Sequence, residues 1–461
     1  MAVTPEPAAA PKVTLEDGVS AVLAAAVATP ITDVTLRQFT GGASRQVFAI
    51  EAHDATGALV RAVLRRDPPG HGDAVRMRAE AACLRAAGAA GVPVPKVLAD
   101  ADTAPGIDAP YLLMERVAGE SIPRKLHRDP QFEQVRPRLA DELGYVLGLI
   151  HRTPLDTLDI LDDDDPLEAI EQIYRDLRDP RPAVEAGLRW LREHPPEGHP
   201  KALVHGDFRI GNFLIEPDGV RAVLDWELAH LGDPIEDLGW LCVRSWRFGA
   251  EPPVGGLGTR DQLLDGYERA TGYRPSAADL HWWEVFGTLK WLVLSRFQAQ
   301  RHLGGTERSI ELAAIGRRVC ESEYDLLEVL GLLDDTVPAS AAGEAITTVH
   351  DQPHPAEILE LVAETLTGEV GPALAPEQSR SRYLLRVCAN LLGIAAREVA
   401  AGTAAAEEVR GHLVALGCES EADLAECVRS GAISYTDDAV RRAVSAAVLA
   451  RLRIANPRHL R

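Results

Sequence analysis

Two aspartates and an asparagine in the middle of the chain have the types and spacing that phosphoryl transfer requires. Four residues separate Asp207 from Asn212, and Asp225 ends an apolar run 13 positions after Asn212. Such a transfer needs one carboxylate that orients the acceptor hydroxyl and takes its proton. It also needs an amide oxygen and a second carboxylate that hold a metal ion against the phosphates. Because the ligands offered are all hard oxygen atoms, the pattern favours Mg²⁺ over Zn²⁺.

The residues around Asp207 also resemble a known family. Residues 205–212 read His-Gly-Asp-Phe-Arg-Ile-Gly-Asn. This is similar to the H-G-D-x-x-x-x-N loop of the aminoglycoside phosphotransferase/choline kinase-like family, distant relatives of the protein kinases. Asp225 lies where protein kinases have the aspartate of D-F-G, and residues 232–238 resemble the family's continuation. The resemblance spans about residues 30–335. It implies ATP and Mg²⁺ as cofactors, Asp207 as the catalytic base, and Asn212 and Asp225 as magnesium ligands.

Other polar residues near this loop receive predicted roles. Arg209 stands two positions after Asp207, where protein kinases commonly have a lysine. We expect Arg209 either to neutralise charge on the transferring phosphate or to be an ordinary surface arginine. We expect His205 to support the loop rather than to transfer protons. Asp233 or Asp237 is expected to accept backbone hydrogen bonds that brace the loop.

A glycine-rich segment closer to the N-terminus predicts a nucleotide-binding loop. Residues 40–48 read Thr-Gly-Gly-Ala-Ser-Arg-Gln-Val-Phe and resemble the family's G-G-x-S loop. In that interpretation the backbone amides of Gly41 and Gly42 and the hydroxyl of Ser44 cover the phosphates.

The strand that follows departs from the kinase pattern at one position. Kinases have a lysine at its end that grips the phosphates and pairs with a helix glutamate. This chain has Arg65 there, with Arg66 as the alternative cation and Glu80 as the expected partner. Arginine keeps the charge but has a larger, planar head. Residues 63–70 also resemble the kinase-like domains fused to some acyl-CoA dehydrogenases.

A second strand leads to the expected hinge. Residues 111–117 read Tyr-Leu-Leu-Met-Glu-Arg-Val, and the backbone near Glu115 and Val117 is predicted to meet the adenine edge. Trp240, Trp246 and the aromatic residues within 280–304 recur at helical spacing, which we interpret as core packing.

The remaining pattern predicts an α+β, two-lobed protein-kinase-like fold followed by an all-helical domain. Short alternating runs and turn signals, such as residues 54–57, predict a small antiparallel sheet lobe, and helical periodicity dominates from residue 131 onward. The expected divisions are a disordered tail (1–12), a nucleotide-binding lobe (13–118), a helical catalytic lobe (119–333), a linker (334–350) and a C-terminal helical domain (351–461).

Composition narrows the class of partner. The net charge of −21 argues against a nucleic-acid binder, and no run is long and apolar enough to predict a membrane span. The six cysteines are scattered without a C-x-x-C pair, so we expect reduced thiols in a cytoplasmic protein. A homodimer through the C-terminal helical domain is a further expectation.

Taken together, the sequence predicts a kinase that transfers the γ-phosphate of ATP to a hydroxyl of a small molecule. The resemblance at residues 63–70 favours a hydroxyacyl or hydroxyacyl-CoA acceptor, while the acidic composition favours an aminoglycoside or choline-type cation. Two other classes stay open. One is a weakly active nucleotide-binding regulatory protein, suggested by the missing lysine. The other uses the C-terminal helices as a partner-binding module, which an exposed apolar face on residues 378–400 would favour.

Overall fold

The computed structural model describes residues 13–39, 45–334, 336–337, 355–375 and 378–460. The chain divides into two compact units, each built from several segments. Unit 1 holds Met1–Asp163, His199–Cys242 and Trp246–Pro275, and unit 2 holds Asp164–Gly198, Val243–Ser245 and Ser276–Arg461. Helices from the predicted helical lobe therefore belong to the same unit as the predicted C-terminal domain. Gly41, Gly42 and Ser44, the tail 1–12 and most of the linker 334–350 lie outside the described residues.

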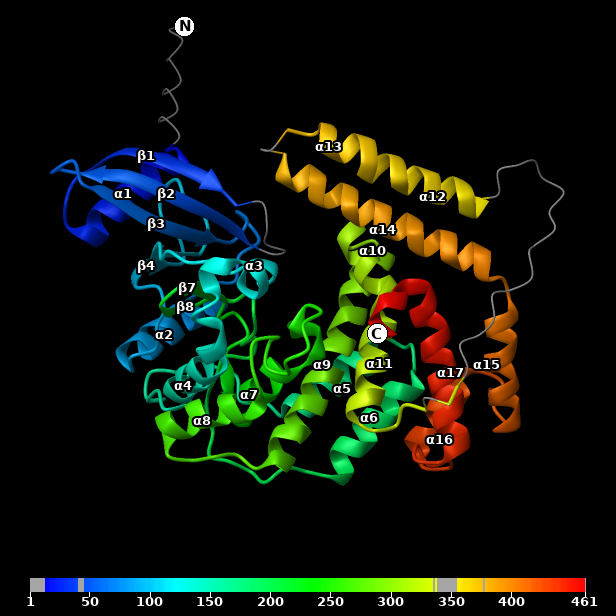
Figure 1. Cartoon of the computed structure of the whole chain (residues 1–461). Helices are drawn as coiled ribbons and strands as arrows, with labels where there is room; N and C mark the ends of the chain where they lie inside the picture. Colours follow the sequence, from blue (N-terminus) through cyan, green and yellow to red (C-terminus); the bar gives the residue numbers. More distant parts are fainter. Residues whose placement is uncertain (1–12, 40–44, 335, 338–354, 376–377, 461) are drawn as a thin grey trace, which may run out of the picture. The chain divides into compact units, whose positions relative to one another are not determined.

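A five-stranded antiparallel sheet begins unit 1 (Figure 1), with the strand order β1-β2-β3-β5-β4. The turn between β2 and β3 closes because the Asp54 carboxylate accepts the amides of Thr56 and Ala58, while Gly57 adopts a φ of +83°. The strands are β1 (Ile31–Gln38), β2 (Gln46–Asp54), β3 (Leu59–Arg66), β4 (Val97–Ala101) and β5 (Tyr111–Glu115).

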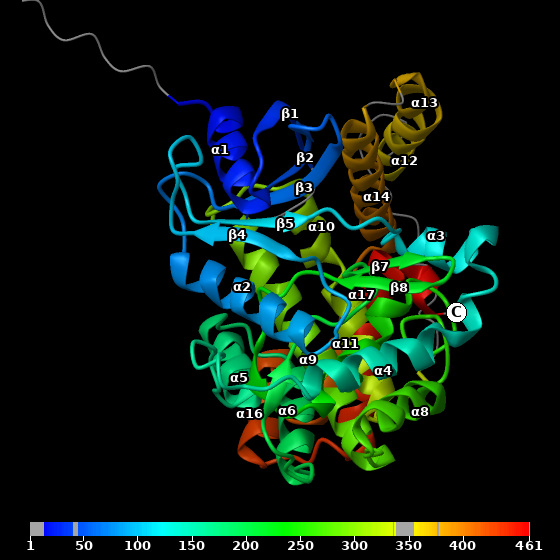
Figure 2. The same cartoon turned by 90° about the vertical axis from the view of Figure 1, so that its left-hand side faces the viewer.

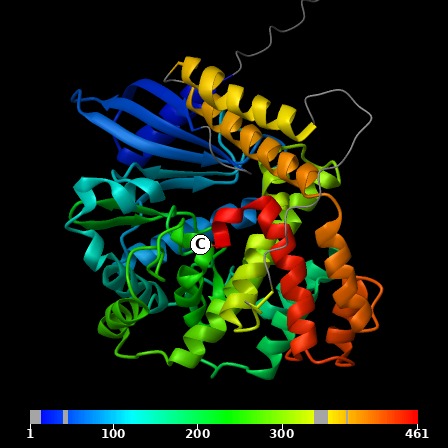
Figure 3. The same cartoon turned by 45° about the vertical axis from the view of Figure 1, so that its right-hand side comes forward.

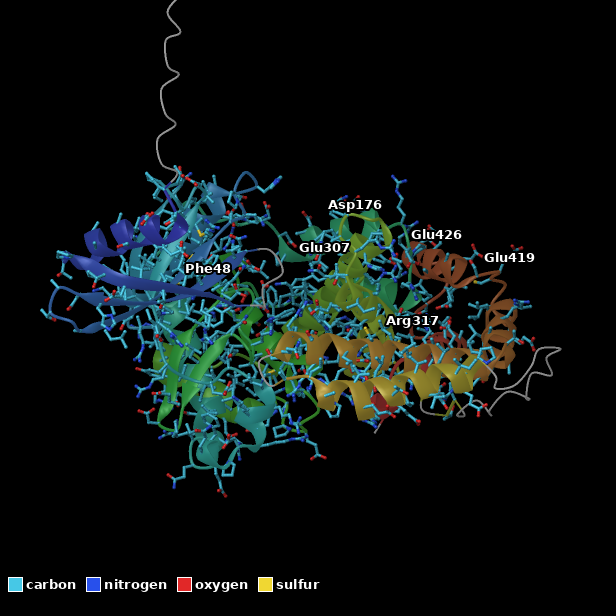
Figure 4. The ribbon with its side chains drawn as sticks, turned by 90° about the horizontal axis from the view of Figure 1, so that it is seen from above. Phe48, Asp176, Glu307, Arg317, Glu419 and Glu426 are labelled. Carbon is cyan, nitrogen blue, oxygen red and sulfur yellow. The ribbon has the colours of Figure 1, made fainter. Side chains whose placement is uncertain are left out.

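Two helices pack against this sheet. Helix α1 (Leu15–Val27) starts at a capping box made by Thr14 and Asp17. Its buried Leu23 joins a core with Phe48 of β2, which is labelled in Figure 4. Helix α2 (Ala74–Ala89) packs against β4 and β5 (Figure 2), and it buries Glu80 on its inner face. The sheet and α2 thus bring the strand arginines and a buried carboxylate together.

The rest of unit 1 combines two short ribbons with helices. Strand β6 (Ala202–Val204) pairs with β9 (His230–Gly232), and β7 (Phe213–Glu216) pairs with β8 (Gly219–Val223). Helices α4 and α8 cross at glycines: a Cβ on Gly144 would lie 1.9 Å from the Leu263 carbonyl oxygen. The helices are α3 (Pro123–Arg128), α4 (Leu139–His151), α7 (Ile235–Cys242) and α8 (Arg260–Thr271).

All the regular secondary structure in the described part of unit 2 is helical, and loops join the helices. Its core joins Leu327 of α11 to Val428 of α16 and Val448 of α17, and α15 and α17 run side by side (Figure 3). Arg317 at the end of α10 pairs with Glu398 of α14 (Figure 4). The main helices are α5 (Pro166–Asp176), α6 (Pro182–Glu193), α9 (Ala277–Leu303), α10 (Ile310–Arg317), α11 (Val319–Val329), α12 (Pro355–Thr365), α14 (Ser379–Ala401), α15 (Ala404–Ala415), α16 (Glu421–Ser430) and α17 (Asp438–Ala455).

Candidate active site

The loop that carries Asp207 is fixed by a buried carboxylate of α7. Asp237 accepts the backbone amides of His205 (2.7 Å) and Gly206 (3.0 Å) and also contacts Nε2 of His151 (3.2 Å). Burial alone would raise the pKa of Asp237, but His151 and the His205 amide outweigh it and hold that pKa below its usual value. Asp233 instead accepts the amide of Ile235. Asp237 is therefore the residue that braces the loop.

His205 is held as a neutral ring. Its Nε2 donates to the Leu224 carbonyl oxygen (3.0 Å), and its Nδ1 accepts the Asp207 amide (3.2 Å). Complete burial lowers the pKa of His205, against the raising effect of Asp237 and Asp207. Both ring nitrogens of His205 are bonded to backbone groups, so neither is open to exchange a proton with a substrate. The contacts support the conformation of the loop.

The Asp207 carboxylate is surrounded by three donors. Oδ1 accepts Nε of Arg209 (2.9 Å) and Nε1 of Trp240 (3.0 Å), and Oδ2 accepts Nδ2 of Asn212 (2.7 Å). Its side chain is 13% exposed. A carboxylate held this way is fixed in rotation, which suits a group that must orient an acceptor hydroxyl.

Backbone contacts of Leu224 connect Asn212 to Asp225. The Asn212 Nδ2 atom donates to the Asp207 side chain and carbonyl, so Oδ1 is the side-chain atom of Asn212 that a metal ion could use. The Asn212 carbonyl accepts the Leu224 amide (2.8 Å), while His205 holds the Leu224 carbonyl, so the residue before Asp225 is clamped from both sides. Asp225 itself adopts a φ of +67°, a conformation that costs a non-glycine residue energy and that often marks a functional position.

Arg65 connects the sheet to Asp225. Its guanidinium pairs with Glu80 through Nη1 and with Asp225 (3.1 Å) and Glu227 (3.6 Å) through Nη2. Arg45 approaches Glu80 from the other side and pairs with Asp67 (3.1 Å). Arg66 instead bonds Gln46 and a backbone carbonyl. The planar guanidinium of Arg65 thus bridges the carboxylates of Glu80 and Asp225. The single ammonium group of a lysine lacks this reach.

The arginine and carboxylate side chains of this cluster are largely shielded from solvent. Burial opposes the charge on Arg65, but Glu80, Asp225 and Glu227 outweigh it and keep the pKa of Arg65 above its usual value. Burial and the neighbouring Asp225 raise the pKa of Glu227, against the two arginines. The site therefore places guanidinium groups beside crowded carboxylates, as a polyanionic ligand with a divalent ion would require.

The predicted adenine contacts lie at the end of β5. The Glu115 amide donates to the carbonyl of Lys96, the residue before β4 (2.9 Å), so this amide is engaged within the sheet. Val117 follows the end of β5, and beyond it Gly119 has a φ of +144° and Glu120 exchanges two backbone bonds with Ile215 of β7. The contact of the backbone near Glu115 and Val117 with the adenine edge stays a prediction.

Four residues of the site were missed or misjudged by sequence reasoning. Glu227 follows Asp225 by two positions, in the run Asp-Trp-Glu, and that proximity in the sequence was a usable signal. Trp240 lies three residues after Asp237, on the same face of α7, and that spacing could have revealed it. Trp246 contributes its ring face to Arg209, with the guanidinium carbon 4.7 Å from the ring centroid. Nothing in the sequence singled out Arg45.

The part of the chain that carries this site matches a known protein family. Residues 35–279, more than half of the chain, match the family described as the phosphotransferase enzyme family. The chain belongs to this phosphotransferase family. Residues 374–459 match a family described only as a domain of unknown function. The resemblance inferred from residues 205–212 is confirmed, and membership places the chain among enzymes that transfer a phosphate group.

The chain is also similar to two curated proteins. The chain is 32% identical over 243 residues to acyl-CoA dehydrogenase family member 10 of Mus musculus, covering 49% of this chain and 22% of that protein. It is 26% identical over 302 residues to family member 11 of Rattus norvegicus, covering 60% and 38%. The chain thus spans well under half of these relatives.

A crystal structure of a Ralstonia eutropha protein assigned as an aminoglycoside phosphotransferase superposes with a TM-score of 0.53. The two are 22% identical, and the match covers 65% of this chain and 93% of that one. This likeness, with the sheet lobe and the helical C-terminal region, confirms the predicted fold class. In the part of the chain that the structure describes, no helix is long and apolar enough to cross a membrane.

Proposed function

We propose that this phosphotransferase moves the γ-phosphate of ATP, held with Mg²⁺, to a hydroxyl of a small molecule. The observation that carries the proposal is the hydrogen-bonded pair of Asp207 and Asn212, with Arg65 reaching from the sheet to Asp225. In this proposal Asp207 orients the hydroxyl and takes its proton, and Arg65 neutralises phosphate charge while Glu80 and Arg45 hold it in place.

The residues present fit a magnesium ion. Oδ1 of Asn212 and the Asp225 carboxylate are hard oxygen donors, which is the set that Mg²⁺ takes when phosphates and water complete its shell. Among the described residues no cluster of three or more His, Cys, Asp or Glu could hold a metal alone. In this proposal the ion would arrive with the nucleotide and would neutralise charge on its phosphate oxygens.

For the acceptor we propose a hydroxyacyl group or hydroxyacyl-CoA. The side chain next to the Asp207 carboxylate is the cation Arg209, 26% exposed and bound to Oδ1, which favours an anionic acceptor over a polycation. The names of the relatives, acyl-CoA dehydrogenase family members, point the same way. An aminoglycoside or choline-type alcohol is the alternative.

The test is an acceptor panel. The protein is incubated with ATP and Mg²⁺ and with hydroxyacyl-CoA thioesters, free hydroxy acids, an aminoglycoside or choline, and ³¹P NMR detects a new phosphate ester. We expect an ester with a hydroxyacyl compound and none with Asp207→Ala. An ester only with the cationic alcohols would replace the acceptor assignment. ATP binding without any ester or ADP would favour the nucleotide-binding regulatory protein instead.

The homodimer and the cytoplasmic location also stay proposals. One observation supports self-association: α12 exposes Ile358, Leu361 and Val362, and α14 exposes Tyr383 and Val399. Helix α12 packs along α14, yet none of its described residues is fully buried, so a second copy could cover its apolar side chains.

A further inference from the structure

We propose that Trp240 is a positioning residue for the catalytic base, and that it selects which oxygen of Asp207 receives the proton. Its indole N–H and the Arg209 guanidinium both donate to Oδ1, and among the described residues Oδ2 receives one donor and keeps one acceptor position. This inference rests on the proposed function, because it assigns a role to a neighbour of the same base.

The argument begins with the acceptor capacity of the carboxylate. Each carboxylate oxygen has two lone pairs. Oδ1 of Asp207 receives Arg209 at 2.9 Å and Trp240 at 3.0 Å, so both are used. Among the residues that the structure describes, Oδ2 receives one donor, Asn212 at 2.7 Å. Oδ2 is therefore the atom with room for the acceptor hydroxyl.

The second step is that Trp240 is built to hold this geometry. It lies on α7, where every residue from Ile235 to Cys242 is buried, and it is itself 3% exposed. Three residues earlier on the same helix, Asp237 fixes the backbone of the Asp207 loop. One helix thus fixes both the loop and the rotation of its carboxylate.

Trp246 completes the arrangement from the other side of Arg209. The two indole rings lie 5.1 Å apart at 54°, and the Arg209 guanidinium stacks on Trp246 at 4.7 Å. This contact keeps the Arg209 Nε atom directed at Oδ1. Trp246 therefore contacts both donors to Oδ1, the indole of Trp240 and the guanidinium of Arg209.

The step that this positions is balanced. The hydroxyl proton moves to Oδ2 of Asp207 while the hydroxyl oxygen forms its bond to the γ-phosphorus. The bond from that phosphorus to the bridging oxygen breaks, and ADP leaves with the electron pair. If Trp240 were absent, Oδ1 would gain a free acceptor position, and the carboxylate could bind the hydroxyl in an unproductive rotation.

The contact itself is tested without any activity. The chain has seven tryptophans, so the indole N–H region of a ¹H–¹⁵N spectrum is sparse, and Trp240→Phe assigns the signal of Trp240. In Asp207→Ala that signal should move and exchange faster with solvent, while the signal of Trp282, which donates to the Leu191 carbonyl, stays in place. An unchanged Trp240 signal would overturn the proposal.

Kinetics tests the role. ADP formation from ATP and Mg²⁺ is compared in wild type, Trp240→Phe and Trp282→Phe, which loses a buried indole bond of the same 3.0 Å length in unit 2. We expect kcat of Trp240→Phe to fall by about 10-fold or more with an unchanged KM for ATP.

Two results separate the failures. A Trp240→Phe enzyme with the kcat and the KM for ATP of Trp282→Phe would overturn the positioning role while the kinase assignment stands. If wild type forms no more ADP than Asp207→Ala, the proposed function fails. In that case Asp207 is not a catalytic base, and Trp240 has no base to position. This holds even if NMR shows the contact between Trp240 and Asp207.

Discussion

Replacing Gly206 by alanine should damage the protein more than its backbone conformation alone predicts. Gly206 has a φ of +78°, where a non-glycine residue costs about 1–2 kcal/mol. In addition, a Cβ at this position would lie 2.3 Å from the Leu228 carbonyl oxygen. Contacts below 3.0 Å essentially do not occur, so backbone must move, at about 1–3 kcal/mol. The free energy of unfolding of unit 1 should therefore fall by about 2–5 kcal/mol.

A matched control separates these two costs. Gly272 has a φ of +75° with nothing within 4 Å of its Cβ position, so Gly272→Ala carries only the conformational cost. Urea unfolding should place Gly206→Ala about 1–3 kcal/mol below Gly272→Ala. Because the loop must shift, ADP formation should fall in Gly206→Ala and not in Gly272→Ala. Equal unfolding free energies for the two variants would refute the steric argument.

Three other predictions follow from the site and from unit 2. Arg65→Lys keeps the charge but cannot span Glu80 and Asp225, so kcat/KM for ATP should fall about 10-fold; an unchanged value would show that the bridge is dispensable. Asp237→Asn should cost about 1–3 kcal/mol of unfolding free energy at pH 7. Since the pKa of Asp237 is lowered by folding, that deficit should shrink below about pH 4, where the unfolded carboxyl binds a proton; a deficit independent of pH contradicts this. Leu361, 61% exposed, should matter to self-association: light scattering should show a wild-type dimer and a Leu361→Glu monomer, and a monomeric wild type would end the homodimer proposal.

The local elements of unit 1 were readable because local chemistry fixes them. The pattern of residues 15–27 predicts a helix, and α1 has those bounds, with the Thr14 cap at its start. In contrast, the periodicity of residues 309–330 predicts one helix, but the structure breaks it at Arg318, where ψ is 6°. Helix periodicity runs through such a break, because packing against other helices decides it.

The site was only partly readable for a similar reason. Asp207, Asn212 and Asp225 share a short stretch of sequence, so their spacing revealed them. Arg45 reaches the site through packing across elements, and no alternation or spacing rule places it there. The three-residue spacing from Asp237 puts Trp240 on the same face of its helix, but that spacing does not say which carboxylate the indole N–H meets. Tryptophan at helical spacing is usually core, and Trp240 is buried as core while its N–H serves the base.

The most direct test is ADP formation by Asp207→Ala in the presence of ATP, Mg²⁺ and an accepted hydroxyl compound. The circular dichroism spectrum of the variant should match wild type, while its free energy of unfolding should fall by about 1–3 kcal/mol, because the buried donors of Trp240 and Asn212 lose their acceptor. The account predicts that turnover falls by about 100-fold or more. A folded Asp207→Ala protein that forms ADP at the wild-type rate would contradict it.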